Sequence, residues 1–204
     1  MENYLQISPY VYDCKVCPTR CDGISKMHYA FENDANFSEG YEQKLINYIN
    51  LSTNYSATKT TQKGYPDVEV KDKNGKVFYI EVKVQQRTFM SVERIIPESG
   101  LKPSETVALN LSDLIRYFEL EDKGKLVIFI FWVILNRPCI LKQEKMQYYY
   151  RLVSELKPIY EEQKDKRRFR RKSGEGDIVD GKHKGVTVNY HFSLNELKLW
   201  NNEL

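Results

Sequence analysis

The longest apolar run of the sequence, LVIFIFWVIL at residues 126–135, limits the folds that the chain can adopt. It has about half of the ~20 residues that a membrane-spanning helix requires. An apolar run of this length without polar alternation is typical of a strand that is buried on both faces. No N-terminal apolar stretch resembles a signal peptide, so we expect a soluble, cytoplasmic protein that makes no contact with membranes.

The first half of the chain predicts a helix followed by a hairpin. Ser38 is a suitable N-cap for a helix that runs to about Asn50. Two strands are expected at 66–70 and 77–85, because apolar residues alternate there. In the connection Asp72-Lys73-Asn74-Gly75, the Asn-Gly pair is expected to supply the positive φ angles of a tight turn.

The second half predicts further elements of both kinds. We expect a third short strand within 87–107, a helix from Ser112 to Leu120, the buried strand, a long tyrosine-rich helix over 143–163 and a strand over 186–192. Ser193 and Glu196 form a capping box, which predicts a last helix. This order describes an α/β fold with a mixed central sheet flanked by helices. The 204 residues fit one main domain at 38–204, preceded by a cysteine-rich segment at 1–37.

Charged residues interrupt the hairpin at definite positions. On its second strand, Phe78, Ile80, Val82 and Val84 are expected to point into the core, while Tyr79, Glu81, Lys83 and Gln85 point to the opposite face. Asp67 lies on the paired strand, so its carboxylate can approach that of Glu81.

Two carboxylates that approach each other repel unless a cation lies between them. Oxygen ligands of this kind select Mg²⁺ or Mn²⁺. An ammonium group beside such an ion, here that of Lys83, can hold a water molecule or meet a phosphate oxygen. Gln85, on the same face, is a further candidate for a water or phosphate contact. The residues therefore predict hydrolysis of phosphodiesters.

Pro66-Asp67, followed after thirteen residues by Glu81-Val82-Lys83, resembles the signature of the PD-(D/E)XK nucleases, which include type II restriction endonucleases, resolvases and repair nucleases. The resemblance covers about residues 38–135. It implies a restriction-endonuclease-like core of a helix, a hairpin, a further strand, a helix and another strand.

The resemblance also implies residue roles. Asp67 and Glu81 would bind the catalytic metal, the backbone carbonyl of Val82 would complete its shell, and Lys83 would orient the attacking water. Family members often add an acid from the first helix. Glu42 is our first candidate, because it shares a helix face with the apolar residues Leu45, Ile46 and Ile49, and Glu39 is the second.

We therefore expect an endonuclease that uses Mg²⁺ or Mn²⁺ and that cleaves double-stranded DNA as a homodimer, with restriction as the setting. Alternatives within the class are a repair or junction nuclease and a viral RNA endonuclease of the same fold. The competing class is a non-catalytic, zinc-containing nucleic-acid-binding module. The purely structural alternative is an exposed hairpin that carries an ordinary ion pair between Glu81 and Lys83.

Three of the four cysteines lie close together, which suits a metal in a reducing compartment better than disulfides. Cys14, Cys17 and Cys21, with His28, could form a tetrahedral zinc site. An iron–sulfur cluster with Cys139 as the fourth ligand is the alternative. Cys139 follows the buried strand, which favours a packing role.

A basic segment near the C-terminus, KDKRRFRRK at 164–172, is the candidate nucleic-acid contact, although the formal net charge of +3 does not by itself argue for a polyanion partner. We expect a mobile loop there, and a solvated charge run is the alternative. The candidate phosphate contacts are Lys166, Arg167, Arg168, Arg170, Arg171 and Lys172. Tyr148, Tyr149 and Tyr150 could stack on bases but are more typical of a core.

Overall fold

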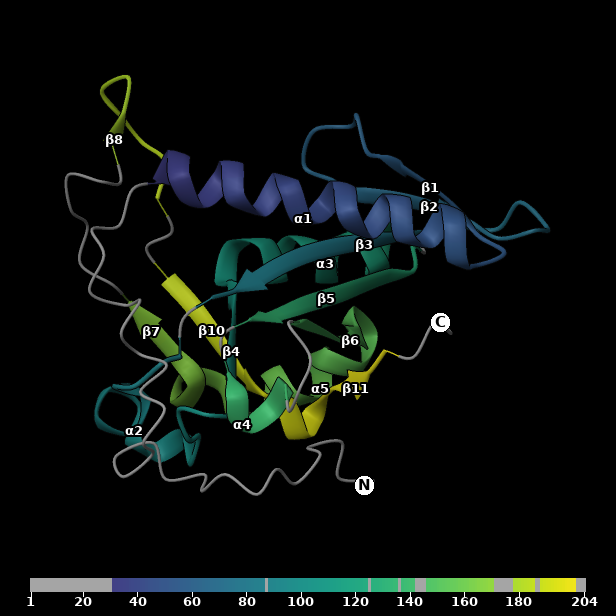
Figure 1. Ribbon diagram of the computed structural model, residues 1–204. Coiled ribbons are helices and arrows are strands. Elements are labelled where there is room, and N and C mark those ends of the chain that lie inside the picture. The colour runs from purple at the N-terminus through teal and green to yellow at the C-terminus, as the bar shows by residue number, and fades with distance from the viewer. Residues whose placement is uncertain are drawn as a thin grey trace.

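A six-stranded mixed sheet organises the computed structural model (Figure 1). Its strand order is β1-β2-β3-β5-β6-β11, in which β3 and β5 are parallel and all other neighbours are antiparallel. The strands are β1 Ser56–Lys59, β2 Val68–Lys71, β3 Val77–Gln85, β5 Ile128–Leu135, β6 Met146–Leu152 and β11 Lys198–Leu199. The fold is thus α/β with a mixed central sheet, as the sequence predicts.

The structure describes residues 31–86, 88–124, 126–135, 137–141, 146–170, 178–185 and 188–200, without the side chains of 31–34 and 138. No helix in these ranges is long and apolar enough to cross a membrane.

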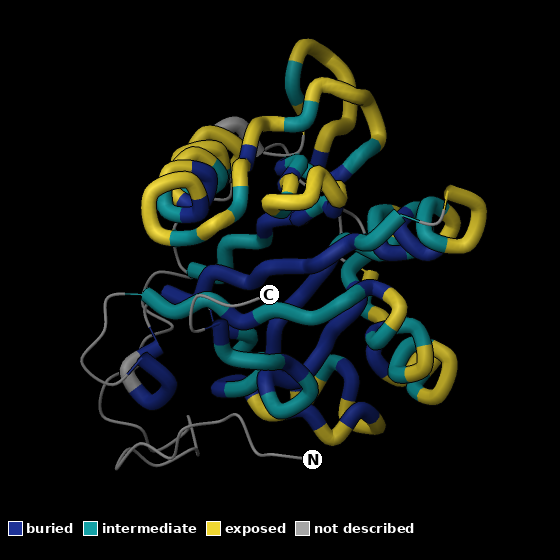
Figure 2. The backbone as a smooth tube through the Cα atoms, turned by 90° about the vertical axis from the view of Figure 1, so that its right-hand side faces the viewer, coloured by how far each residue is buried: buried dark blue, intermediate teal, exposed yellow. Residues whose placement is uncertain are grey.

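The apolar run forms β5, and all of its residues from Ile128 to Leu135 are buried. Alternate side chains enter two separate hydrophobic clusters, one on each face of the sheet. The helix α3, Leu111–Gly124, provides part of the crossover that the parallel pairing of β3 and β5 requires. The prediction of a strand covered on both faces is confirmed (Figure 2).

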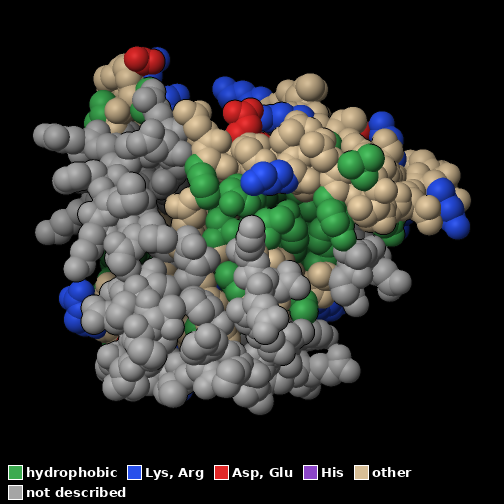
Figure 3. Space-filling model, viewed as in Figure 1, with side chains coloured by type: hydrophobic (Ala, Val, Ile, Leu, Met, Phe, Trp, Pro, Cys, Tyr) green, Lys and Arg blue, Asp and Glu red, His purple; other side chains and the backbone are tan. Residues whose placement is uncertain are grey.

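One face of the sheet packs against the helix α1, Phe31–Ser52 (Figure 1). Leu45, Ile46 and Ile49 of this helix are buried, and they belong to the same cluster as the core-facing side chains of β3. Half-buried apolar residues extend the cluster, and hydrophobic side chains gather below α1 in the space-filling view (Figure 3).

The helix α1 begins at Phe31, seven residues before the predicted cap at Ser38. A domain boundary between residues 37 and 38 would therefore fall inside a continuous helix. The printed sequence has no proline between 31 and 52, so nothing in it obliges the helix to start at Ser38.

The other face of the sheet is covered by α3, by α5 at Val153–Gln163 and by a three-stranded sheet. The strands of this second sheet are β4 Thr106–Asn110, β10 Val188–Ser193 and β7 Arg168–Arg170, in the order β4-β10-β7. The short elements that remain are α2 Val92–Ile95, η2 Pro97–Ser99, α4 Pro138–Leu141, η3 Lys164–Arg167, β8 Ile178–Val179, β9 Lys182–His183 and η5 Leu194–Glu196.

The predicted helix over 143–163 is wrong in its first part, because Met146–Leu152 forms the strand β6. The side chains of Tyr148 and Tyr150 pack in the cluster below α1, whereas Tyr149 is buried in the opposite cluster. Tyrosine fits a pleated, half-buried surface well, and the apolar neighbour β5 offered a partner for the whole segment. The tyrosines are thus core residues, and the helix starts only at Val153.

The hairpin of β2 and β3 is confirmed, with Val68 opposite Ile80. Its turn differs from the prediction, because Gly75 has a positive φ of 79° and Asn74 is not among the residues with positive φ. The backbone N–H groups of Asn74 and Lys76 both donate to Oδ1 of Asp72 at 2.8 Å. The carboxylate of Asp72 therefore stabilises the turn, and one glycine in the left-handed region completes it.

Two further expectations are corrected. The region 87–107, where the sequence predicts a third short strand, contains α2, η2 and only the start of β4, which begins at Thr106 and belongs to the second sheet. The sequence did not predict β1, which precedes the hairpin in the main sheet. The capping box of Ser193 and Glu196 is present, but it caps only the short η5, and β11 follows instead of a helix. The chain pairs with β6 there, since the N–H of Trp200 donates to the carbonyl of Tyr148.

Candidate active site

Asp67 lies immediately before β2, where the ladder between β2 and β3 ends. Its Oδ2 accepts a hydrogen bond from the backbone N–H of Val82 at 2.8 Å. The carboxylate thus takes the place of a strand partner for β3. The N–H and C=O groups of a strand residue point to the same edge, so the carbonyl of Val82 faces the side on which Asp67 lies.

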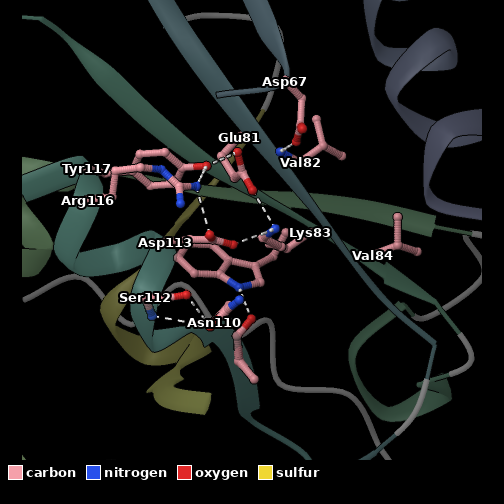
Figure 4. A network of polar contacts seen from close by, with 12 residues as sticks. Asp67, Glu81, Val82, Lys83, Val84, Asn110, Ser112, Asp113, Arg116 and Tyr117 are labelled. Atoms are coloured by element: carbon pink, nitrogen blue, oxygen red, sulfur yellow. Dashed lines mark hydrogen bonds and ion pairs between the residues drawn. The ribbon is translucent and has the colours of Figure 1, made fainter. Parts of the chain in front are cut away.

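Glu81 is on the opposite face of β3 from the apolar residues that pack against α1, and it is only 3% exposed. One of its oxygens, Oε2, accepts a hydrogen bond from the hydroxyl of Tyr117 on α3. The other, Oε1, forms an ion pair with the ammonium group of Lys83 (Figure 4). Both carboxylate oxygens of this buried acid therefore have partners.

Lys83 has a second carboxylate neighbour, because its Nζ lies 3.6 Å from Oδ2 of Asp113. Oδ1 of Asp113 in turn binds Nη2 of Arg116 at 2.7 Å, and the same nitrogen lies 3.3 Å from the hydroxyl oxygen of Tyr117. Glu81, Lys83, Asp113, Arg116 and Tyr117 thus form a closed polar ring between β3 and α3 (Figure 4).

Three acids near this point have raised pKa values. Burial raises the pKa of Glu81 to about 7, and the charge of Asp67 adds to the shift against the attraction of Lys83. Burial also raises the pKa of Asp67, with a further contribution from Glu42. The pKa of Glu42 is raised too, by burial first and also by Glu81. These three carboxylates therefore share one electrostatic environment, in which burial outweighs the attraction of the nearby lysines.

The basic and phenolic members of the polar ring keep their protons. Burial lowers the pKa of Lys83, but the carboxylates of Glu81, Asp113 and Asp67 outweigh it and hold this pKa above its ordinary value. Burial and the charge of Glu81 raise the pKa of Tyr117. Lys83 is therefore a cation and Tyr117 a hydrogen-bond donor at neutral pH.

The first helix contributes an acid to this environment, as the sequence predicts. Glu42 lies 3.5 Å from Nζ of Lys59, and its side chain is 14% exposed. Glu39 also pairs with Lys59, but its side chain is 63% exposed. Only Glu42 is electrostatically linked to both Asp67 and Glu81, so it is the better candidate of the two.

The donor set fits a hard divalent cation in its chemistry. Glu42, Asp67 and Glu81 offer carboxylate oxygens, the donor type that such ions prefer, and a cation bound among them would reduce their mutual repulsion. Asp67 engages Val82 through Oδ2, and among the residues that the structure describes its Oδ1 has no hydrogen-bond donor. Within the described residues, however, no three Asp, Glu, His or Cys side chains are arranged as a metal site. An ion that bound Oε1 of Glu81 would take the place that the ammonium group of Lys83 occupies at this oxygen.

Sequence reasoning missed Asp113, Arg116 and Tyr117. Their spacing of three and four residues, which places them on one side of a helix, was the available signal. The apolar residues Leu114 and Phe118 of this helix indicate its buried side and say nothing about the partners of its polar side chains. The spacing alone does not indicate which strand the polar side of α3 contacts.

Gln85 has a structural contact. Its Oε1 accepts from the N–H of Ala108 at 3.2 Å, and its Nε2 donates to the carbonyl of Val84 at 3.3 Å. It links β3 to β4, so we do not assign it a water or phosphate contact.

The structure describes the basic segment as far as Arg170, and the predicted mobile loop is wrong for that part, which forms η3 and β7. Arg168 and Arg170 are exposed, and Phe169 between them is half-buried, because successive side chains of a strand point to opposite faces. Lys166 is exposed as well. Arg167 is buried and forms an ion pair with Glu196 at 2.6 Å, so it has a structural contact in place of the predicted phosphate contact. Arg171 and Lys172 lie outside the described residues.

The cysteine cluster also lies outside the described residues, so Cys14, Cys17, Cys21 and His28 remain a sequence prediction of a zinc site. Cys139 is buried in the cluster beneath α3, in agreement with a packing role.

No protein-family model and no curated protein matches the chain. Among solved structures, it is similar to Hjc, a Holliday junction resolvase of Archaeoglobus fulgidus. The alignment covers 77% of this chain and 84% of the resolvase, with a TM-score of 0.40 and 8% sequence identity. At these values the similarity carries no argument about the site, which rests on this chain's own residues.

Proposed function

We propose that this protein is a divalent-metal-dependent nuclease that hydrolyses phosphodiester bonds. The observation that carries the proposal is the convergence of Asp67, Glu81 and Glu42, whose pKa values are all raised, next to the ammonium group of Lys83. An ordinary exposed ion pair on a hairpin would explain neither the burial of Glu81 nor the raised pKa of Asp67.

In the proposed mechanism, Asp67 and Glu81 would hold the ion, Mg²⁺ or Mn²⁺, together with the backbone carbonyl of Val82, and Glu42 would contribute from α1. The ion would supply positive charge beside the scissile phosphate. Lys83 orients the attacking water, and its ammonium group can also donate to a phosphate oxygen. Asp113 keeps Lys83 in place when Glu81 is engaged elsewhere.

We further propose that the substrate is double-stranded DNA, cleaved internally by a homodimer, with restriction as the biological setting. The edge strand β7 exposes Arg168 and Arg170, and Lys166 is exposed nearby in the chain. These residues support a polyanionic substrate, because a guanidinium group can donate two parallel hydrogen bonds to one phosphate.

The test is cleavage of plasmid, linear duplex, four-way junction, single-stranded DNA and RNA by the purified protein in Mg²⁺, in Mn²⁺ and in EDTA. We expect cleavage of the duplex that EDTA abolishes. Lys83→Ala should reduce the cleavage rate by at least about 10²-fold, the scale typical of losing one donor that stabilises charge at the reacting group, while duplex binding persists.

Lys123→Ala is the matched control, because Lys123 is an exposed lysine that pairs with Glu119 on the far part of α3. Equal cleavage by Lys83→Ala and Lys123→Ala would contradict the proposed role of Lys83. Cleavage of the junction or of RNA alone would keep the nuclease proposal and replace its substrate. Absence of metal-stimulated cleavage of all five substrates would overturn the nuclease proposal.

A further inference from the structure

The two contacts of the Glu81 carboxylate differ in how easily they can be replaced. Oε1 meets Lys83, whose side chain is 26% exposed and which has Asp113 as a second partner. Oε2 meets the hydroxyl of Tyr117, a residue only 1% exposed within the hydrophobic cluster. An incoming cation can therefore displace Lys83 toward Asp113, but it cannot displace Tyr117 without disturbing the core.

The hydroxyl of Tyr117 has a fixed orientation. Arg116 can only donate hydrogen bonds, so its contact at 3.3 Å makes the phenolic oxygen an acceptor. The single hydroxyl hydrogen is then directed to Oε2 of Glu81. Asp113 holds the guanidinium of Arg116 at 2.7 Å, which keeps this arrangement in place from the helix side (Figure 4).

Ions differ in how they use a carboxylate. Ca²⁺ takes six to eight oxygen ligands and accepts both oxygens of one carboxylate, whereas Mg²⁺ requires near-octahedral geometry and uses few protein ligands. A carboxylate with one oxygen already engaged by a buried donor suits the smaller ion.

We propose that Tyr117 is a positioning residue that leaves Glu81 one oxygen for a divalent cation and thereby favours Mg²⁺ and Mn²⁺ over Ca²⁺. This inference rests on the proposed function, because it concerns the same metal site. It assigns to α3 a role in the choice of ion, whereas the oxygen ligands themselves come from α1 and from the hairpin.

The test measures metal binding by the full chain without nucleic acid. Bound Mn²⁺ is determined by electron paramagnetic resonance of the free ion, and Ca²⁺ is added as the competitor. In Tyr117→Phe, which removes only the hydroxyl, we expect Ca²⁺ to displace Mn²⁺ at a concentration about fivefold lower than in the wild type, the factor of one net hydrogen bond.

Tyr190→Phe is the matched control, because Tyr190 is a buried tyrosine of the same cluster whose hydroxyl donates to the backbone carbonyl of Tyr160 at 3.5 Å. It should leave the competition unchanged. Tyr117→Leu removes the hydroxyl with a different shape, and it replaces Tyr117→Phe if that variant does not fold.

The outcomes separate the two proposals. Unchanged competition in Tyr117→Phe, or an equal change in Tyr190→Phe, would overturn the role of Tyr117 and leave the nuclease proposal intact. Absence of Mn²⁺ binding to the wild-type protein would remove the metal site, and with it both proposals.

Discussion

The carboxylate of Asp67 and the backbone N–H of Val82 are joined by a hydrogen bond of 2.8 Å. This contact ties the residue before β2 to the middle of β3, where the strands no longer pair with each other. It also places Asp67 beside the strand that carries Glu81 and Lys83. The same hydrogen bond is therefore part of the sheet and part of the candidate active site.

Substitutions of Asp67 should separate these two roles. Asp67→Asn retains an oxygen that can accept from Val82 and loses the charge that burial disfavours, so its free energy of unfolding should not fall. Asp67→Ala leaves the N–H of Val82 without that acceptor and should lower the free energy of unfolding by about 1–3 kcal/mol. Urea denaturation measures both. Cleavage should be lost in both variants, and equal stability of the two would show that the hydrogen bond contributes nothing.

Glu121 should make stability depend on pH. Burial raises its pKa to about 7 from an ordinary value of 4.5, although its Oε1 accepts a hydrogen bond from the N–H of Ile128. The folded protein thus holds this proton more tightly than the unfolded chain does. The resulting stabilisation is complete below about pH 4.5 and disappears as the pH rises toward 7.

Glu121→Gln should accordingly match the wild-type free energy of unfolding near pH 4 and exceed it by about 1 kcal/mol at pH 8, after allowance for partial solvent exposure. Urea denaturation across this range measures the difference. Glu119→Gln, a change at an exposed position of the same helix, is the control. A gap between Glu121→Gln and wild type that does not vary with pH would contradict the expectation.

Arg168 and Arg170 should contribute to nucleic-acid affinity through phosphate contacts. Their replacement by alanine should weaken duplex binding and reduce the slope of log affinity against log salt concentration by about 2, since each lost contact releases about one counterion fewer. Fluorescence anisotropy at several salt concentrations measures the slope. Lys123→Ala/Lys157→Ala removes the same charge from α3 and α5, at positions paired with Glu119 and Asp122. A similar reduction in this control would mean that only net charge matters.

Arg167 should affect stability and leave binding unchanged, despite its place in the basic segment. Its guanidinium forms a largely buried ion pair with Glu196, the acid of the capping box. Arg167→Met leaves that carboxylate without its cation and should lower the free energy of unfolding by about 3 kcal/mol. The salt dependence of duplex binding should stay as in the wild type. A lower slope in a folded Arg167→Met protein would restore the phosphate contact that the sequence predicts.

Local chemistry specifies several parts of this protein, and these could be predicted from the residues alone. The uninterrupted apolar run made β5 a strand covered on both faces. Alternation and the turn residues specified the hairpin, although Gly75 supplies a positive φ that Asn74 does not. The spacing of Asp67, Glu81 and Lys83 on that hairpin was enough to predict that they lie together, because side chains on neighbouring strands share a face in a fixed register.

Other features depend on contacts between residues that are distant in the chain, and no local pattern predicts them. The segment at 146–152 became a strand because β5 offered it an apolar edge, a contact that no local periodicity reveals. Arg167 turned inward because Glu196, on a different element, lies within reach. Tyr117 and Asp113 joined the site for the same reason, since only the packing of α3 against the sheet brings the polar side of this helix to Glu81 and Lys83.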